Sequence, residues 1–328
     1  MKRWELAAVA LTIVSGASLR PAIAQQLAPK MPRVGIISPA QSEDTPIFRA
    51  FREGLREHGY IEGQNIVLEF RLARGDYQSL PGLVSELVNL PVDIIVTDGG
   101  PGVARLAKEA TQQIPIVMGI SGGDPVASGI VESFSRPGGN ITGLTLMQRE
   151  LSAKRVDVLK AAIPEATAIT VLLNPSNPGA ATNFKSTEEA AAHAGLTTIT
   201  RIDAASPEEL RSLSPLSLKT PLLVIPDAML WNHRRDILTW AERARVPGVY
   251  PEREYADDGG LIGYGPNVPN NFRRAAFYVD RILKGAKAGD LPIEEPSKVD
   301  FVINLRSAKA LGFQMPTAIL IRADEVIE

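Results

Sequence analysis

A short motif after an apolar run offers the most familiar chemistry in the chain. Residues 119–123 read Gly-Ile-Ser-Gly-Gly and match G-x-S-x-G, the turn that exposes a serine nucleophile in α/β-hydrolases. Such a serine needs a later acid and then a histidine, and the chain has only His58, His193 and His233. His193 falls inside a predicted helix and His233 begins one, so neither has the loop setting of a catalytic base. A secreted hydrolase using Ser121 is therefore the weaker interpretation. The glycines are expected to admit a ligand close to the backbone or simply to form a turn.

Loops that follow predicted strands carry polar groups in the first half of the chain. The run 97–102, Thr-Asp-Gly-Gly-Pro-Gly, precedes a predicted helix, where free N–H groups and the helix dipole favour an anion such as a carboxylate. A plain strand-to-helix turn is the open alternative. The runs 38–44 and 121–124 follow two other strands. Because ligands bind at the carboxyl ends of parallel strands, the candidate ligand-binding residues here are Ser38, Gln41, Thr97, Gly99, Gly100, Ser121 and Asp124.

The second half of the chain repeats this arrangement. Asp227 directly follows a predicted strand and could pair with the ammonium of a ligand, although capping the next helix is an equally good role. The candidates at other strand ends and near presumed crossings between domains are Asn174, Asn177, Tyr264 and Asn267, with Ser176 beside them. Trp231 or Tyr250 could stack on an apolar ligand group, but aromatic residues more often lie in the core.

Several other site classes lack their motifs. No G-x-G-x-x-G follows a strand, and no Walker-type lysine motif is present, so a dinucleotide or a P-loop nucleotide is not expected. The histidines do not cluster, and no H-E-x-x-H pattern indicates a metal. Basic and acidic residues are interspersed at a formal net charge of −2, without the basic stripe of a nucleic-acid-binding protein. We therefore expect no cofactor, no metal and no nucleic-acid partner.

Short apolar strands alternate with amphipathic helices from residue 33 onward, which indicates α/β domains with parallel sheets. In the first domain we expect strands at 33–38, 66–70, 92–97, 114–120 and 141–146, and helices at 47–58, 77–89 and 103–111. After Leu146 the pattern restarts, with strands at 169–173, 197–202, 222–225 and 249–250 and helices at 151–163, 181–193, after Ser206 and at 232–245.

Two domains of one style, joined without a Gly/Ser tether, suggest a hinge across a cleft. The runs 141–146, 261–264 and 294–305 are expected to cross between the domains, and a helix at 271–283 would return to the first. A short helix at 307–312 is expected near the end. A length of 328 residues agrees with two domains.

The first 24 residues have the pattern of a secretory signal peptide. Lys2 and Arg3 precede an apolar core at 6–16, and Ala-Ile-Ala ends the segment as a small-x-small cleavage site. The apolar run is shorter than the roughly 20 residues that span a membrane, which disfavours an uncleaved anchor. The chain has no cysteine, which excludes disulfides, thiol catalysis and a lipid-modified N-terminal cysteine. We expect export, cleavage near Ala24 and a freely soluble mature protein.

Motifs spread over the chain are similar to those of one family. Taken together they resemble the substrate-binding components of ABC transporters of the tryptophan/tyrosine-type family, and the resemblance covers about 33–328. The motifs are Asp124-Pro-Val126, the run 135–143 (SRPGGNITG), Leu151-Ser-Ala-Lys-Arg155, the run 263–267 (GYGPN), the run 281–287 (RILKGAK), Ile303-Asn-Leu305, the run 308–312 (AKALG) and the run 322–328 (RADEVIE).

The resemblance implies a type I periplasmic binding protein, with two Rossmann-like α/β lobes joined by three hinge crossings. Its lobes would comprise 33–143 with 265–294, and 144–264 with 295–328. It implies a small-molecule ligand, an amino acid and possibly an aromatic one, whose carboxylate is held near Thr97 and Ser121 and whose amine is held by Asp227. It also implies a monomer without enzymatic activity, which delivers its solute to an ABC permease and ATPase in the inner membrane. A sensor that signals to a membrane receptor would have the same lobes and is the alternative.

Overall fold

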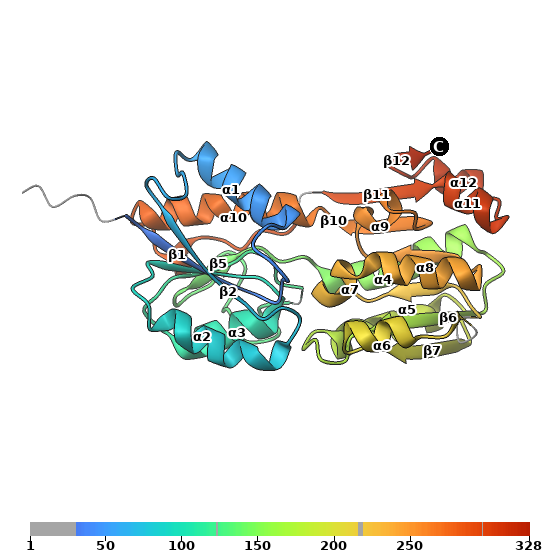
Figure 1. The fold of residues 1–328 in the computed structure, drawn as a ribbon, viewed down its shortest axis with the longest axis horizontal. Helices are drawn as coiled ribbons and strands as arrows, with labels where there is room; N and C mark the ends of the chain where they lie inside the picture. Colours follow the sequence, from blue (N-terminus) through green and yellow to red (C-terminus); the bar gives the residue numbers. More distant parts are fainter. Residues whose placement is uncertain (1–30, 123, 216–218, 297) are drawn as a thin grey trace, which may run out of the picture. The chain divides into compact units, whose positions relative to one another are not determined.

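The computed structural model describes residues 31–122, 124–215, 219–296 and 298–328, and residues 31–328 form one compact unit. The predicted signal peptide lies outside the described residues. Two sheets organise the unit, with five strands in the order β2-β1-β3-β4-β5 and seven in the order β12-β11-β10-β9-β8-β6-β7 (Figure 1). We call each sheet, with the helices packed on it, the first and the second lobe.

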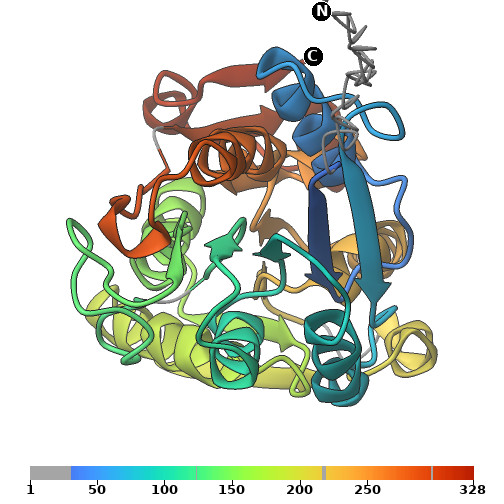
Figure 2. The same cartoon turned by 90° about the vertical axis from the view of Figure 1, so that its left-hand side faces the viewer.

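The first sheet is wholly parallel and is covered on both faces. Alternate residues of its strands point to opposite sides, so Val34 and Ile36 contact one helical layer while Ile37 and Ile95 contact the other. One layer consists of α1 (Pro46–Glu57) and α10 (Val268–Leu283), which lie side by side although they are far apart in the sequence (Figure 2). The other consists of α2 (Leu80–Val88) and α3 (Pro101–Ala110). The strands are β1 (Arg33–Ser38), β2 (Val67–Leu72), β3 (Ile94–Thr97), β4 (Ile116–Met118) and β5 (Ile141–Gly143).

Local signals explain where α1 begins and ends. Thr45 caps its N-terminus by accepting a hydrogen bond from the amide of Phe48, and Pro46 occupies its first position. Gly59 follows with a φ of 86°, a conformation that favours glycine after a helix. The buried face of Phe48, Phe51 and Leu55 has the predicted i, i+3, i+7 spacing.

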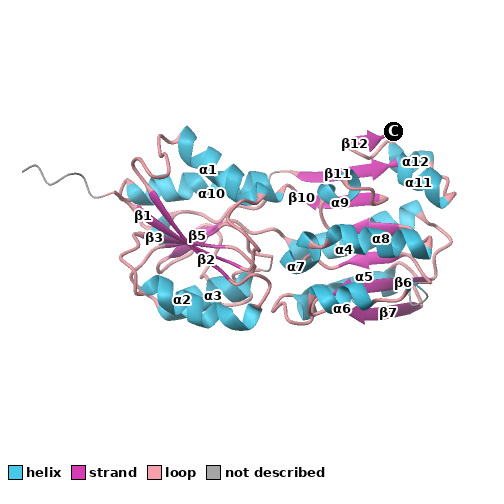
Figure 3. Cartoon of the chain, in the orientation of Figure 1, coloured by secondary structure: helices cyan, strands magenta, loops and turns pink. Residues whose placement is uncertain are grey.

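The second sheet is parallel except for one pair, β10 and β11, which run antiparallel. Its layers alternate helix, sheet and helix, as in the first lobe (Figure 3). The strands are β6 (Ala168–Leu173), β7 (Thr198–Asp203), β8 (Leu222–Val224), β9 (Gly248–Tyr250), β10 (Ile262–Pro266), β11 (Val299–Asn304) and β12 (Glu325–Ile327). One face is packed by α4 (Gln148–Ala162), α5 (Ala180–His193), α11 (Leu305–Leu311) and α12 (Thr317–Leu320), and the other by α6 (Pro207–Ser212), α7 (Ala228–Asn232), α8 (Arg234–Ala244) and α9 (Arg253–Asp257).

Three segments connect the lobes. The first leaves β5 at Gly143, which has a φ of 128°. A side chain does not fit there, because a Cβ would lie 2.3 Å from the carbonyl oxygen of Met118. Its next residue, Leu144, forms a parallel bridge with Glu294 of the third segment. The second runs from β10 into α10 and the third from α10 to β11. Three crossings between two α/β lobes confirm the predicted fold class.

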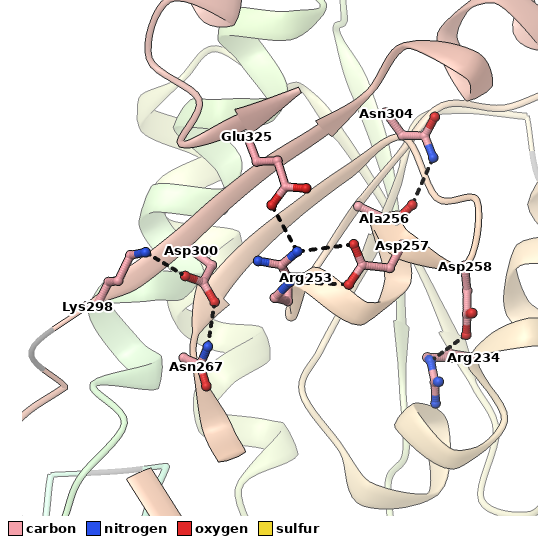
Figure 4. A network of polar contacts seen from close by, with 10 residues as sticks. All are labelled: Arg234, Arg253, Ala256, Asp257, Asp258, Asn267, Lys298, Asp300, Asn304 and Glu325. Carbon is pink, nitrogen blue, oxygen red and sulfur yellow. Dashed lines mark hydrogen bonds and ion pairs between the residues drawn. The ribbon is translucent and has the colours of Figure 1, made fainter. Parts of the chain in front are cut away.

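The last two crossings are tied to each other by side chains. Asn267, just after β10, donates a 3.0 Å hydrogen bond to Asp300 of β11 (Figure 4). On the same sheet, Arg253 contacts both Asp257 and Glu325, which joins α9 to β12. The bond between Asn267 and Asp300 ties β10 to β11, the antiparallel pair through which the chain leaves and re-enters the second lobe.

Some elements differ from the sequence prediction. The helix predicted at 77–89 begins as a 3₁₀ turn (Tyr77–Ser79). The helix predicted at 232–245 corresponds to α8, and the short helix α7 before it was not predicted. The short elements α9, α12 and β12 had no periodic signal and were not predicted. The predicted division at 264 and 265 falls inside β10, which is paired on both sides in the second sheet. Among the described residues, no helix combines the length and apolar character that a membrane span requires.

Candidate functional site

A cavity of about 390 Å³ is lined by residues of both lobes. Part of its polar lining, including Asp98, Asn177 and Asp227, comes from loops at the carboxyl ends of strands, as expected for parallel sheets. Its apolar wall includes Ile47, Ile120, Leu146, Trp231 and Val268. An apolar pocket of this size with a few convergent polar groups is the usual form of a small-molecule site.

The loop after β3 brings backbone groups to the first-lobe side. Gly99 and Gly100 line the cavity with φ values of 103° and 90°, so both adopt a backbone conformation that favours glycine. Gly100 is the N-cap of α3 and offers no capping side chain. Pro101 opens the helix without an N–H, and the amide of Gly100 donates to the carbonyl of Ile120, so the first amides that can be free are those of Gly102 and Val103. The helix dipole adds positive potential beside the cavity. Arg149 of α4 also lines the cavity.

A buried carboxyl lies beside this loop. Asp98 lines the cavity and accepts a 2.5 Å hydrogen bond from Oγ of Ser38. Burial raises the pKa of Asp98 to about 6, and the bond from Ser38 opposes that rise. Ser38 itself does not line the cavity, so its visible role is to hold Asp98.

Thr97 and Ser121 are fully buried behind the cavity wall. Neither hydroxyl has a hydrogen-bond partner among the described residues, and neither residue lines the cavity. The carbonyl of Ser121 accepts bonds from Leu146 and Thr145, which fixes the backbone of this loop. No histidine of the described chain lines the cavity, and none forms a hydrogen bond with the Ser121 hydroxyl. Gly123, the end of the G-x-S-x-G motif, lies outside the described residues.

Asp227 lines the second-lobe side, and its carboxylate is already surrounded by donors. Its Oδ1 accepts bonds from the amide of Leu230 at 3.0 Å and from Asn174 at 3.3 Å. Its Oδ2 accepts bonds from Asn177 and from the Tyr77 hydroxyl, both at 2.9 Å. Asp227 therefore caps α7, the alternative that the sequence left open, and also bonds to the first lobe through Tyr77.

Only some of the ligand-binding residues predicted from the sequence line the cavity. Gly99, Gly100, Asp124, Asn177 and Asp227 line it, whereas Ser38, Gln41, Thr97, Ser121, Asn174, Tyr264 and Asn267 do not.

Each of three outlying residues has a visible structural role. Gln41 donates to the carbonyl of Arg74 at 2.9 Å. Tyr264 packs edge-on against Phe301, with ring centroids 5.4 Å apart. Asn267 caps α10 and bonds to Asp300. Of the two stacking candidates, Trp231 lines the cavity, and Tyr250 is buried in the core against Tyr255.

Two acidic residues in the cavity wall were not predicted. Glu252 and Glu254 follow β9 and line the cavity. Burial raises the pKa of Glu252 to about 8, and it also raises the pKa of Glu254. Ligands bind at the carboxyl ends of parallel strands, and applying this to the predicted strand at 249–250 would have predicted Glu252 and Glu254 as candidates. The described residues contain no group of three or more His, Cys, Asp or Glu side chains placed to hold a metal ion.

Comparisons with known proteins agree with this architecture. The sequence model of a family described as "ABC transporter substrate binding protein" matches residues 36–327. A curated tyrosine-binding protein of Clostridioides difficile is 27% identical over 272 residues, which cover 82% of this chain and 77% of that protein.

Solved structures share the fold. A structure from Streptococcus pneumoniae in complex with L-Trp has a TM-score of 0.80 at 23% identity, covering 90% of this chain and 99% of that one. A conserved domain protein from Vibrio cholerae has a TM-score of 0.80 at 24% identity, covering 90% of this chain and 100% of that one. The fold is that of type I periplasmic binding proteins. The chain belongs to the ABC transporter substrate-binding protein family, whose members work outside the cytoplasm and capture a small molecule for a membrane permease.

Proposed function

We propose that the captured solute is an amino acid, with aromatic amino acids as the leading class. The observation that carries this proposal is that one cavity, lined by residues of both lobes, contains groups that suit an anion and groups that suit a cation. The uncapped start of α3 and Arg149 suit a carboxylate, and the acidic strand ends of the second lobe suit an ammonium. Trp231 and the aliphatic wall suit an apolar side chain between them. Relatives that bind tyrosine and tryptophan support the same class.

The proposed mechanism is closure of the lobes over the solute, without chemistry. A ligand that contacts both lobes binds the closed form more tightly than the open form, so it shifts the population toward closure. The crossings at Gly143, at Asn267 and between α10 and β11 act as the hinge between the two lobes. A monomer released by signal cleavage near Ala24 would then present the closed form to its permease and ATPase in the inner membrane, from the periplasmic side.

Thermal-shift screening of the mature chain, beginning near Gln25, tests this proposal. L-tryptophan and L-tyrosine are expected to raise Tm, and tryptamine, which lacks the carboxylate, is expected to raise it much less. Ligand binding stabilises the folded state in proportion to the logarithm of concentration over Kd.

A matched pair of variants places the binding site. Asp227→Asn changes a carboxylate in the cavity wall and should reduce the shift, whereas Asp157→Asn changes an exposed carboxylate on α4 and should not. If no amino acid at millimolar concentration alters Tm, the proposed solute class is wrong.

A further inference from the structure

Glu252 is a buried residue with one carboxyl oxygen that has no hydrogen-bond partner among the described residues. It follows β9, which pairs in parallel with β8, so it stands beside the strand end that carries Asp227. It lines the cavity with only 7% of its surface exposed, and its Oε2 has no hydrogen-bond partner among the described residues. Burying a carboxyl without a partner is costly, and in a binding site a missing ligand group can explain it.

Arg155, one of two cations whose charge acts on Glu252, makes its hydrogen bonds with other groups. Arg155 of α4 is fully buried, and its charge acts on Glu252. Its Nε donates to the carbonyl of Tyr264 at 2.8 Å, and its Nη2 donates to Gln148 at 3.1 Å and to the carbonyl of Pro251 at 3.3 Å. Nη1 of Arg155 also lacks a hydrogen-bond partner among the described residues, so neither group satisfies the other.

Asp227, the other carboxyl at this edge, differs in one respect. Four donors already occupy its two oxygens, and one of them is the hydroxyl of Tyr77. An incoming ammonium would have to displace one of these bonds or share an oxygen with them. At Glu252 it would gain a buried charged hydrogen bond without breaking any, and such bonds are among the strong ones.

We propose that Glu252 is the residue that accepts the protonated amine of the solute, with Asp227 shaping the wall beside it. This inference rests on the proposed amino-acid class and assigns its amine to one side chain. It places the ammonium at the end of β9, across the cavity from the start of α3 where the carboxylate is proposed to lie.

Binding at Glu252 has a consequence for protons. Burial keeps this carboxyl protonated in the ligand-free protein at neutral pH, because its pKa is raised to about 8. Pairing with an ammonium requires the ionised form of Glu252. When the charged amine binds, the carboxyl proton of Glu252 is therefore released to solvent. The O–H bond of the carboxyl is replaced by an N–H···O hydrogen bond from the amine. The charged and titratable groups that face Glu252 from the surrounding elements are Arg155 on α4, Arg234 on α8, Glu254 and Tyr255 on α9, and Asp227 after β8.

Calorimetric titration of the mature protein with L-tryptophan, L-tyrosine and indole-3-propionate tests the assignment. The last probe keeps the ring and the carboxylate of tryptophan but has no amine. Glu252→Gln keeps the shape of the side chain and removes its charge, and it should weaken binding of both amino acids about 10- to 100-fold. It should leave the weak binding of indole-3-propionate unchanged. Glu242→Gln, the same change at an exposed residue of α8, serves as the control.

Proton release provides a readout that does not depend on any variant. At pH 7, titrations of the wild type in two buffers with different ionisation enthalpies should show close to one proton released per amino acid bound. The affinity should rise with pH, by up to about tenfold per unit, until the pH passes the pKa of Glu252. Glu252→Gln should abolish the release.

The outcomes separate this inference from the proposed function. If Glu252→Gln binds L-tryptophan within about twofold of the wild type, the assignment to Glu252 is overturned and the amino-acid function stands. If the wild type binds no amino acid, both proposals are overturned. Should the variant fail to fold, the probe without an amine decides: the assignment is overturned if the wild type binds indole-3-propionate as tightly as L-tryptophan.

Discussion

The hydroxyl of Tyr77 donates a 2.9 Å hydrogen bond to Oδ2 of Asp227, and this bond joins the first lobe to the second at the cavity wall. Tyr77 precedes α2, and Asp227 caps α7. Both side chains are buried, so the bond is shielded from water and contributes more than a surface contact.

Tyr77→Phe is therefore expected to loosen the lobes in the ligand-free protein. The substitution removes only the hydroxyl, at a cost of about 1.5–3 kcal/mol for a hydrogen bond to a charged group. Small-angle scattering should show a larger radius of gyration, and Tm should fall. Tyr278→Phe is the control, because its hydroxyl bonds to the carbonyl of Pro292 at 2.8 Å rather than to the second lobe. Equal expansion in both variants would contradict the prediction.

The stability of the ligand-free protein should decrease with pH because of Glu252. Burial raises the pKa of this carboxyl from 4.5 to about 8, so between these values the folded chain holds a proton that the unfolded chain has lost. The contribution of Glu252 to the unfolding free energy is therefore complete below the unfolded-state pKa of 4.5, and it declines as pH rises toward the folded-state pKa of about 8.

Glu252→Gln should remove this decline. Between pH 6 and 8 the unfolding free energy of the wild type should fall by about 2 kcal/mol more than that of the variant. Asp98 has a pKa of about 6 and contributes with the same sign mainly below this window. Denaturant titrations at the two pH values measure the difference, with Glu242→Gln as the control. Parallel pH profiles for wild type and Glu252→Gln would show that the carboxyl is ionised when folded.

Trp231 should report ligand binding by its fluorescence. Its ring lines the cavity, and the guanidinium of Arg234 lies 4.6 Å from the ring centroid. Trp240 is buried in the core, and its Nε1 donates to the carbonyl of Ser214. With excitation at the red edge of tryptophan absorption, the added L-tyrosine itself is hardly excited. Its binding should then change the tryptophan emission of the wild type and of Trp240→Phe. A signal that survives in Trp231→Phe would place the ligand elsewhere.

Gly143→Ala should destabilise the first crossing. A Cβ at this position would lie 2.3 Å from the carbonyl oxygen of Met118, and the φ of 128° is itself unfavourable for alanine. The expected loss is about 3 kcal/mol or more, measured by denaturant unfolding. Gly129→Ala is the matched control, because its φ is also positive, at 68°, but no atom lies within 4 Å of the added carbon, so it should lose only about 1–2 kcal/mol.

The sequence alone determined the fold class and the loops from which a site could be built. Runs such as 33–38 and 169–173 are short, apolar and followed by polar residues, and each became a strand that ends near the cavity edge of its sheet. Amphipathic spacing predicted the helices between them, because a helix that covers a sheet must bury one face. Export and cleavage near Ala24 remain predictions.

Only the tertiary structure decided which strand-end side chains face the cavity. The order of strands depends on packing between segments far apart in the sequence, so nothing in the run 249–252 announced that β9 would lie beside β8. Capping also depends on the tertiary structure: the side chains of Asn267 and Asp227 both cap helices, whereas the side chain of Glu252, at the N-cap of α9, makes no capping bond. A carboxyl at a strand end thus becomes a candidate binding group when local backbone amides and neighbouring lobes leave it unsatisfied, and that balance is set by contacts that no single stretch of sequence contains.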